Sequence, residues 1–402
     1  MAAVSQRKQF ATVLSIVFFG FLGVSIPYLI FPALFVNPEY SILPSSWPFA
    51  YHALFLGITL AAYPFGQFLG SPILGALSDD YGRKPLLSGS LVVAAMCNLL
   101  TGFALTGRIL WLIVLSRLVA GFMEGNIAIA RAMAADMKGL SKHGTFGKIN
   151  AAASIAYFIG PFLGGILAEV TIATPFYMIG ILFGVLAILS MLLLESGVVA
   201  SGEKKGFLVR INVIGQLARL FRNKRLQFLV IVSTCFTLAI DMFYEFGPVY
   251  LTMKWELCPS KLIIYNSVLC ATLAIGNGWL PTYISKRYST RYWIIGAMSG
   301  LALLLIGMVI TNSPPLMVVL FGLSGFFIGS GVTLLMVKVS DSSADSIQGE
   351  VMGTLLSLRV LGDAIICLLG GVLILFSPKI ILVLAAFLSL STMFYFKKTA
   401  LR

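Results

Sequence analysis

Seven ionisable residues stand inside long apolar stretches of the sequence, where a charge is costly. A charged side chain exposed to lipid costs roughly 2.5–3.5 kcal/mol on an insertion scale, so all seven would cost on the order of 20 kcal/mol. They must therefore face one another or a polar cavity, where acids can exchange protons and arginines can hold anions. The seven are Arg117, Glu124, Arg131, Asp241, Glu245, Arg359 and Asp363.

The spacing of these residues predicts which of them share a helix face. Residues seven apart return to within about 20° of the same direction on a helix, so Arg117, Glu124 and Arg131 form one stripe. Asp241 and Glu245 are four apart and share a face. Arg359 and Asp363 have the same spacing with opposite charges and can pair along their helix.

This pattern indicates a group that responds to protons and to cargo. Asp241 and Glu245 repel each other as carboxylates, so they are the first candidates to retain a proton, and Glu124 is the next. An acid that binds either a proton or a cationic cargo couples the two flows by competition. The alternative is that the charges form structural ion pairs, Arg117 or Arg131 with Glu124, and Arg359 with Asp363.

The residues within the spans are compatible with more than one kind of cargo. Aromatic residues beside the acids of the seventh apolar segment would suit an apolar or cationic molecule, whereas the arginines would suit an anion. A drug, a carboxylate-rich metabolite and a siderophore all fit, and aromatic residues on a span more often serve packing. The aromatic candidates for the cavity are Phe243, Tyr244, Phe246 and Tyr250.

The elements that position these residues are membrane-spanning helices. The chain has 402 residues, of which 59% are hydrophobic and 11% charged, which excludes an ordinary soluble domain. The apolar stretches are continuous rather than alternating, which excludes an outer-membrane barrel. Twelve segments are long enough to span, at about 9–36, 50–77, 85–106, 109–135, 145–169, 172–194, 226–252, 261–285, 292–311, 315–337, 351–376 and 378–396.

Lysine and arginine positions predict the orientation of these helices. Twenty-one lie at the N-terminus, in the even-numbered loops or at the C-terminus, and four lie in the odd-numbered loops, which places both termini in the cytoplasm. The polar stretch 195–225 separates six spans at 1–194 from six at 226–402 and could hold a basic amphipathic helix. Segments 147–165 and 353–371 align as a weak internal repeat, which supports two related halves.

Several other classes of function are not supported. The five cysteines and two histidines show no metal-binding or catalytic spacing, so we expect no metal and no cofactor. The net charge of +13 arises mostly in cytoplasmic loops, so we expect lipid contacts and no nucleic-acid partner. An intramembrane enzyme or a receptor that moves nothing is the remaining competitor from another class.

Three motifs carry a family resemblance. GALSDDYGRKPLL at 75–87 resembles the signature loop of the major facilitator superfamily, and RLVAGFMEGN at 117–126 is similar to its R-x-x-x-G motif. A third group resembles the antiporter motif of the drug:proton antiporter branch, which includes tetracycline and multidrug exporters. That group is Gly147, Gly160, Pro161, Gly164 and Gly165. Asp80 stands where the family usually has a basic residue, and Ala156 replaces one motif glycine.

The signature loop predicts a cytoplasmic gate. Its glycines would permit close helix approach and a tight turn, Asp79 would lie near a helix N-terminus, and a base would pair with Asp136. The alternative is that the bases only set topology. The gate candidates are Gly75, Asp79, Gly82, Arg83, Lys84 and Asp136.

We therefore expect an all-helical integral membrane protein with twelve helices in two six-helix, pseudo-symmetric bundles. The resemblance implies a secondary transporter in a bacterial inner membrane that exports a small molecule in exchange for protons by alternating access. The alternative within this fold is a proton-coupled symporter that imports a nutrient or organic anion. A proline and small residues at 160–165 would give a bend or a close packing seam, with or without a role in direction. We expect a monomer.

Overall fold

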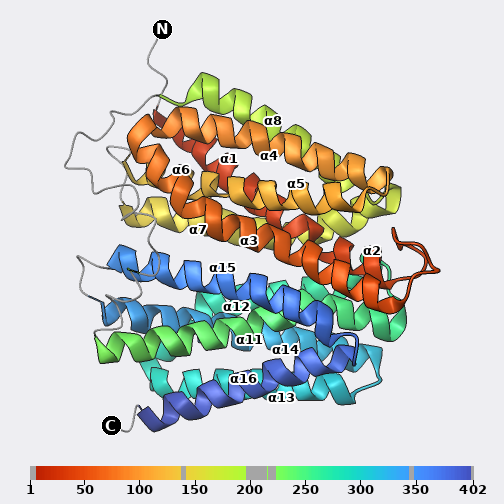
Figure 1. Ribbon diagram of the computed structural model, residues 1–402. Helices are drawn as coiled ribbons and strands as arrows, with labels where there is room; N and C mark the ends of the chain where they lie inside the picture. Colours follow the sequence, from red (N-terminus) through yellow and green to blue (C-terminus); the bar gives the residue numbers. More distant parts are fainter. Residues whose placement is uncertain (1–5, 137–141, 196–214, 216–222, 344–347, 400–402) are drawn as a thin grey trace. The chain divides into compact units, whose positions relative to one another are not determined.

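The computed structural model describes residues 6–136, 142–195, 215, 223–343 and 348–399. The described residues form helices joined by short turns and contain no strand (Figure 1). Twelve spans among them are long and apolar enough to cross a membrane, which confirms the predicted helical membrane fold. The predicted amphipathic helix at 195–225 falls almost entirely outside the described residues.

Contacts divide the chain into two compact units. The first unit comprises Met1–Leu34 and Ile58–Asn212, and the second comprises Phe35–Gly57 and Val213–Arg402. The division therefore passes through two helices near the N-terminus, α2 (Ile30–Val36) and α3 (Phe49–Tyr81), as well as the predicted linker.

The first unit begins with a span that is broken at proline. α1 (Gln6–Ser25) gives way to a short 3-10 helix, η1 (Ile26–Leu29), and then to α2. Pro27 lies in the first turn of η1, where its missing backbone N–H interrupts the hydrogen bonding of a continuous α-helix. The remaining helices of this unit are α4 (Arg83–Thr106), α5 (Leu110–Met123), α6 (Gly125–Asp136), α7 (Lys142–Val170) and α8 (Thr174–Leu193).

The packing of α8 shows how these helices divide lipid from protein. Ile181, Val185, Ile188 and Leu192 follow one another along one face of the helix and are exposed. The opposite face is buried, and α8 packs against α4 and α1 (Figure 1). An exposed face that is wholly aliphatic suits hydrocarbon rather than water, so α8 has one lipid-facing side and one protein-facing side.

The second unit places α11 among three other helices. α11 (Lys224–Trp255) packs against α14, α15 and α16, while α12 packs mainly against α14 (Figure 1). The helix α11 therefore carries Asp241 into the interior of this unit, whereas Glu245, one turn later, is partly exposed. The bounds of its other helices are α12 (Pro259–Arg287), α13 (Thr290–Ile310), α14 (Pro314–Asp341), α15 (Gln348–Leu373) and α16 (Pro378–Thr399).

Candidate functional site

Glu124 lies at a break in the fourth span. α5 ends at Met123 and α6 begins at Gly125, and Glu124 between them is 8% exposed. Its backbone N–H donates to the Gly121 carbonyl at 3.0 Å, and its own carbonyl accepts from Ile127 N–H at 3.0 Å. Both bonds join residues three apart, so the chain makes a tighter turn at this residue than an α-helix would.

A glycine contact brings a tyrosine to this acid. A Cβ atom at Gly121 would overlap the backbone carbonyl of Tyr63, so α3 and α5 approach closely only because residue 121 is glycine. The side chain of Tyr63 then lies close enough to the carboxyl group of Glu124 to interact with it, and both residues line the same cavity. The sequence did not distinguish Tyr63, because it is uncharged and stands in a span with several other aromatic residues.

The two arginines predicted to share a stripe with Glu124 are placed near it. The Arg117 guanidinium is buried and lies 4.3 Å from the ring centroid of Tyr63, and that of Arg131 lies 5.2 Å from the ring centroid of Phe21. Both arginines interact electrostatically with Glu124. The structure thus brings together the three charged residues of the fourth span and stacks both guanidiniums on aromatic rings.

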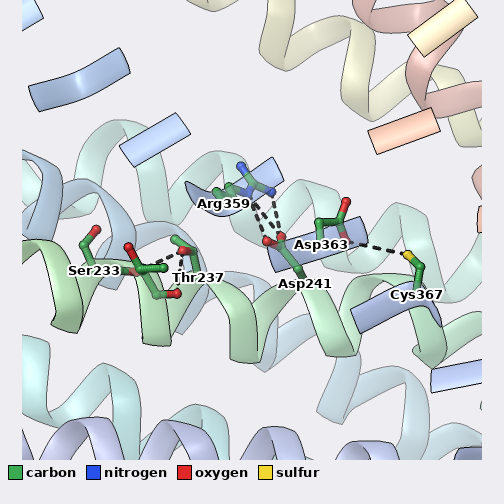
Figure 2. Close-up of polar contacts among 7 residues, drawn as sticks. Ser233, Thr237, Asp241, Arg359, Asp363 and Cys367 are labelled. Carbon is green, nitrogen blue, oxygen red and sulfur yellow. Dashed lines mark hydrogen bonds and ion pairs between the residues drawn. The ribbon is translucent and has the colours of Figure 1, made fainter. Parts of the chain in front are cut away.

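A second charge cluster lies within the other unit, between α11 and α15. Arg359 Nη2 donates to Asp241 Oδ1 at 2.7 Å, and Arg359 Nε lies 3.2 and 3.1 Å from the two Asp241 oxygens (Figure 2). One turn earlier on α11, the Thr237 hydroxyl donates to the Ser233 carbonyl at 2.9 Å. Arg359 therefore pairs across two helices with Asp241, a partner that the spacing along its own helix did not suggest.

Asp363 instead faces a thiol and two other acids. Cys367 Sγ donates to Asp363 Oδ1 at 3.9 Å (Figure 2). Asp363 also interacts electrostatically with Glu245 and Asp241, as well as with Arg359. The four charged residues predicted on α11 and α15 therefore form one cluster, with three carboxyl groups and one guanidinium.

The Asp241–Arg359 pair is unevenly exposed. The side chain of Asp241 is 5% exposed, whereas that of Arg359 is 49% exposed. A guanidinium in the middle of a span cannot remain half exposed to hydrocarbon without a large cost. We infer that it faces a polar space, because about half of the Arg359 side chain is exposed while Asp241 holds one edge of its donor fork.

The aromatic candidates on α11 mostly pack within their own unit. Phe243, Phe246 and Tyr250 are each 1% exposed, and the ring centroid of Phe243 lies 5.0 Å from that of Phe321. The Tyr250 hydroxyl donates to the Met308 carbonyl at 3.0 Å. Tyr244 is only partly buried, so it alone among the four presents accessible surface beside the acids.

The signature loop forms the predicted tight turn but not all of the predicted gate. Gly82 has a φ angle of +93° and joins α3 to α4. At Gly75, however, a Cβ atom would meet no neighbour within 4 Å, so the expected close helix approach does not occur there. Asp79 lies in the last turn of α3, just before α4, which begins with Arg83 and Lys84. The side chain of Asp136 lies outside what the structure describes, so its pairing with a base stays a prediction.

The antiporter-like motif on α7 packs against the broken part of the first span. A Cβ atom at Gly160 would overlap the hydroxyl of Ser25, and one at Gly164 would overlap the carbonyl of Ile26. The Ser25 hydroxyl also lies 3.3 Å from the Ala156 carbonyl. Gly160 and Gly164 therefore form a close packing seam, as expected, and Pro161, Gly165 and Gly147 lie in the same helix, α7.

Gly164→Ala is expected to destabilise the protein by about 1–3 kcal/mol, because the added methyl group forces α7 away from η1. Gly184→Ala on α8 is the matched control, since a Cβ atom there meets no neighbour within 4 Å. The control should be neutral or stabilising by up to about 1 kcal/mol. Thermal unfolding of both variants in detergent measures the difference, and equal midpoints would contradict the close contact.

Comparison with known sequences places this architecture in a family. The sequence profile of the Major Facilitator Superfamily matches residues 11–365, which is most of the chain. The chain belongs to the major facilitator superfamily. Its family and its fold are therefore those of membrane transporters rather than enzymes, and the predicted family is confirmed.

Two relatives within the superfamily are similar over three quarters of their length. The class H tetracycline resistance protein of Pasteurella multocida is 28% identical over 318 residues, 75% of each chain. The class C tetracycline resistance protein of Escherichia coli is 26% identical over 323 residues, 76% of each chain. Among solved structures, the human organic anion transporter MFSD10 matches with a TM-score of 0.70 and 19% identity, covering 98% of this chain and 99% of its own. This last similarity supports the fold alone.

Proposed function

We propose that this protein is a secondary active transporter that exports a small molecule, in the first instance a drug, in exchange for protons. The observation that carries the proposal is the buried carboxyl group of Glu124 beside Tyr63, Arg117 and Arg131 within the fourth span. A buried carboxylate is costly unless it is neutralised by a donor, a cation or a proton. Its charge can therefore be balanced in more than one way, as coupling to a proton flux requires.

The names of the relatives, which are antibiotic resistance proteins, support the outward direction of transport. A membrane transporter makes a cell resistant to an antibiotic by lowering the concentration inside, so resistance implies outward movement. Relatives named tetracycline resistance proteins, similar over three quarters of each chain, favour export of a drug by this chain. A metabolite or a siderophore remains a possible cargo of the same chemistry, whereas import has no observation in its favour.

The second charge cluster supplies a site for the cargo. Asp241, Glu245 and Asp363 surround one guanidinium, so the cluster has an excess of negative charge when all three acids are ionised. That excess suits a cationic group, while the exposed, positively charged side chain of Arg359 suits an acidic group of the same molecule. Movement of this site between the two membrane faces would complete an alternating-access cycle.

The setting we propose is a bacterial inner membrane with both termini in the cytoplasm. The support is the excess of lysine and arginine at the termini and in even-numbered loops, and the bacterial origin of the relatives. We further propose that the protein works as a monomer and that its partners are its cargo, protons and lipid.

Everted vesicles provide the test. With the lumen acidified, an exporter takes labelled tetracycline from the bath into the lumen as protons leave, and a protonophore stops the uptake. We expect uptake only with this polarity of the gradient. Uptake only when the bath is made more acidic than the lumen would indicate symport with protons and overturn the proposal. A cationic dye serves as a second cargo if tetracycline is not moved.

A further inference from the structure

Two buried side-chain oxygens near the break in the fourth span have no hydrogen-bond partner among the described residues. They are Oδ1 of Asn98 on α4 and Oε2 of Glu124, and the two residues are 3% and 8% exposed. A buried acceptor without a donor is costly, and native proteins satisfy nearly all such groups with protein or water. Both atoms therefore need a donor.

The hydrogen bond of the Asn98 amide nitrogen identifies the amide atom that is left without a partner. Asn98 Nδ2 donates to the Ala94 carbonyl at 2.8 Å, one turn earlier on α4. A carbonyl oxygen can only accept, so the atom that bonds to it must be the amide nitrogen. The remaining amide atom is an oxygen that can only accept. It cannot satisfy the Glu124 carboxylate directly, because two acceptors do not bond.

A small cavity lies between these two groups. It has a volume of about 10 Å³ and is lined by both Asn98 and Glu124, together with Tyr63, Arg117 and Asn126. One water molecule requires roughly 10–15 Å³ of such space and two to four polar partners. The cavity therefore has about the room and the polar lining for one water molecule. A bound cation is disfavoured there, because Arg117 and Arg131 already bring two positive charges near Glu124.

We propose that one internal water molecule donates its two hydrogens to Asn98 Oδ1 and Glu124 Oε2. Asn98 is then a positioning residue, which holds the water that solvates the carboxyl group. When Glu124 carries a proton on Oε2, the hydroxyl donates to the same water, which still donates to Asn98. The importance of this water for transport rests on the proposed function, whereas its presence does not.

A buried hydrogen bond close to Asn98 in the sequence joins α4 to α5. Thr101 Oγ1 lies 2.7 Å from Ser116 Oγ, which joins α4 to α5 about one turn from Asn98. Both residues are buried, and neither lines the cavity. Thr101→Val therefore removes a buried polar contact between the same two helices without touching the water site, and it serves as the matched control.

The test is infrared difference spectroscopy of the full-length protein between a protonated and a deprotonated state of Glu124, in H₂¹⁶O and H₂¹⁸O. In the wild-type protein, we expect one O–H stretching band of a bound water that shifts with ¹⁸O. Asn98→Leu should lose this band and move the carboxyl C=O band of Glu124 to higher wavenumber, whereas Thr101→Val should do neither. Gradient-driven transport should fall about tenfold in Asn98→Leu, since one hydrogen bond to a charged group is lost.

Two results would overturn the proposal. One is a wild-type protein with no ¹⁸O-sensitive band, or with a band that persists in Asn98→Leu. The other is a Glu124 carboxylate band that shifts when Na⁺ is added, in a protein that shows no band sensitive to ¹⁸O. That result would indicate a bound cation. If Asn98→Leu does not fold, Asn98→Ala provides the same comparison. A wild-type protein that shows the water band but no proton-driven transport would count against the proposed function alone.

Discussion

Glu124→Gln is expected to reduce gradient-driven drug uptake into everted vesicles by about 100-fold or more, a loss typical of removing a group that transfers protons. Glutamine has the shape of glutamate and can still form hydrogen bonds, but it cannot take up or release a proton. The helix break at residue 124 should persist, because the backbone bonds of Gly121 and Ile127 make it. The measurement is the initial rate of uptake with an acidified lumen.

The same preparation contains its own control. Exchange of labelled for unlabelled drug across the vesicle membrane at equal pH needs no net proton movement, so Glu124→Gln should retain it. Glu169→Gln on the exposed end of α7 should retain both activities. Undiminished gradient-driven uptake in Glu124→Gln would remove this acid from the coupling mechanism, and loss of both activities would reassign it to cargo binding or folding.

Arg359→Ala is expected to destabilise the protein by about 3 kcal/mol, whereas Asp241→Asn should cost distinctly less. The difference follows from exposure, since the Asp241 side chain is 5% exposed and the Arg359 side chain 49%. Without the guanidinium, Asp241 is left buried without its cation. Without the carboxylate, the guanidinium can still be hydrated and can donate to the asparagine oxygen. Thermal unfolding in detergent, followed by tryptophan fluorescence, measures both changes.

A double replacement separates stability from transport. Asp241→Leu combined with Arg359→Leu should recover much of the lost stability, because apolar residues often replace a buried ion pair without cost. If the pair binds cargo, this variant should still fail to transport. Arg287→Ala provides a control at an exposed arginine, which donates to the nearby Tyr283 hydroxyl. Equal losses for Arg359→Ala and Asp241→Asn would contradict the argument from exposure.

The spans were predictable from sequence because crossing hydrocarbon imposes a length and an apolar composition on each segment independently of its partners. The same holds for the turn at Gly82, which needs a residue that tolerates a positive φ angle. The helix break at Glu124 was harder to predict from the sequence. No proline stands there, and the glycines on either side of Glu124 serve packing against α3 as much as local flexibility.

The partners of the charged residues could not be predicted in the same way. Spacing along one helix correctly grouped Arg117 with Glu124 and Arg131, because all three share one span. It did not reveal Asp241 as a partner of Arg359, because Asp241 lies 118 residues earlier in the chain and only tertiary packing brings them together. Asn98 and Tyr63 were overlooked because a single uncharged polar residue in a span is ordinary, and only the geometry around it shows its neighbours.

The distance in sequence between Asp241 and Arg359 also bears on how the protein is made. A ribosome adds about 5–20 residues per second, so roughly 6–24 seconds pass between synthesis of these two residues, which stand 118 apart. During that time α11 has two acids in the translocon or the bilayer with no arginine from α15 to balance them. An unbalanced charge in hydrocarbon is costly, so we expect this interval to be the one in which the nascent chain is most easily lost. Substitutions at Arg359 should therefore lower the yield of protein in cells more than its heat resistance after purification would suggest.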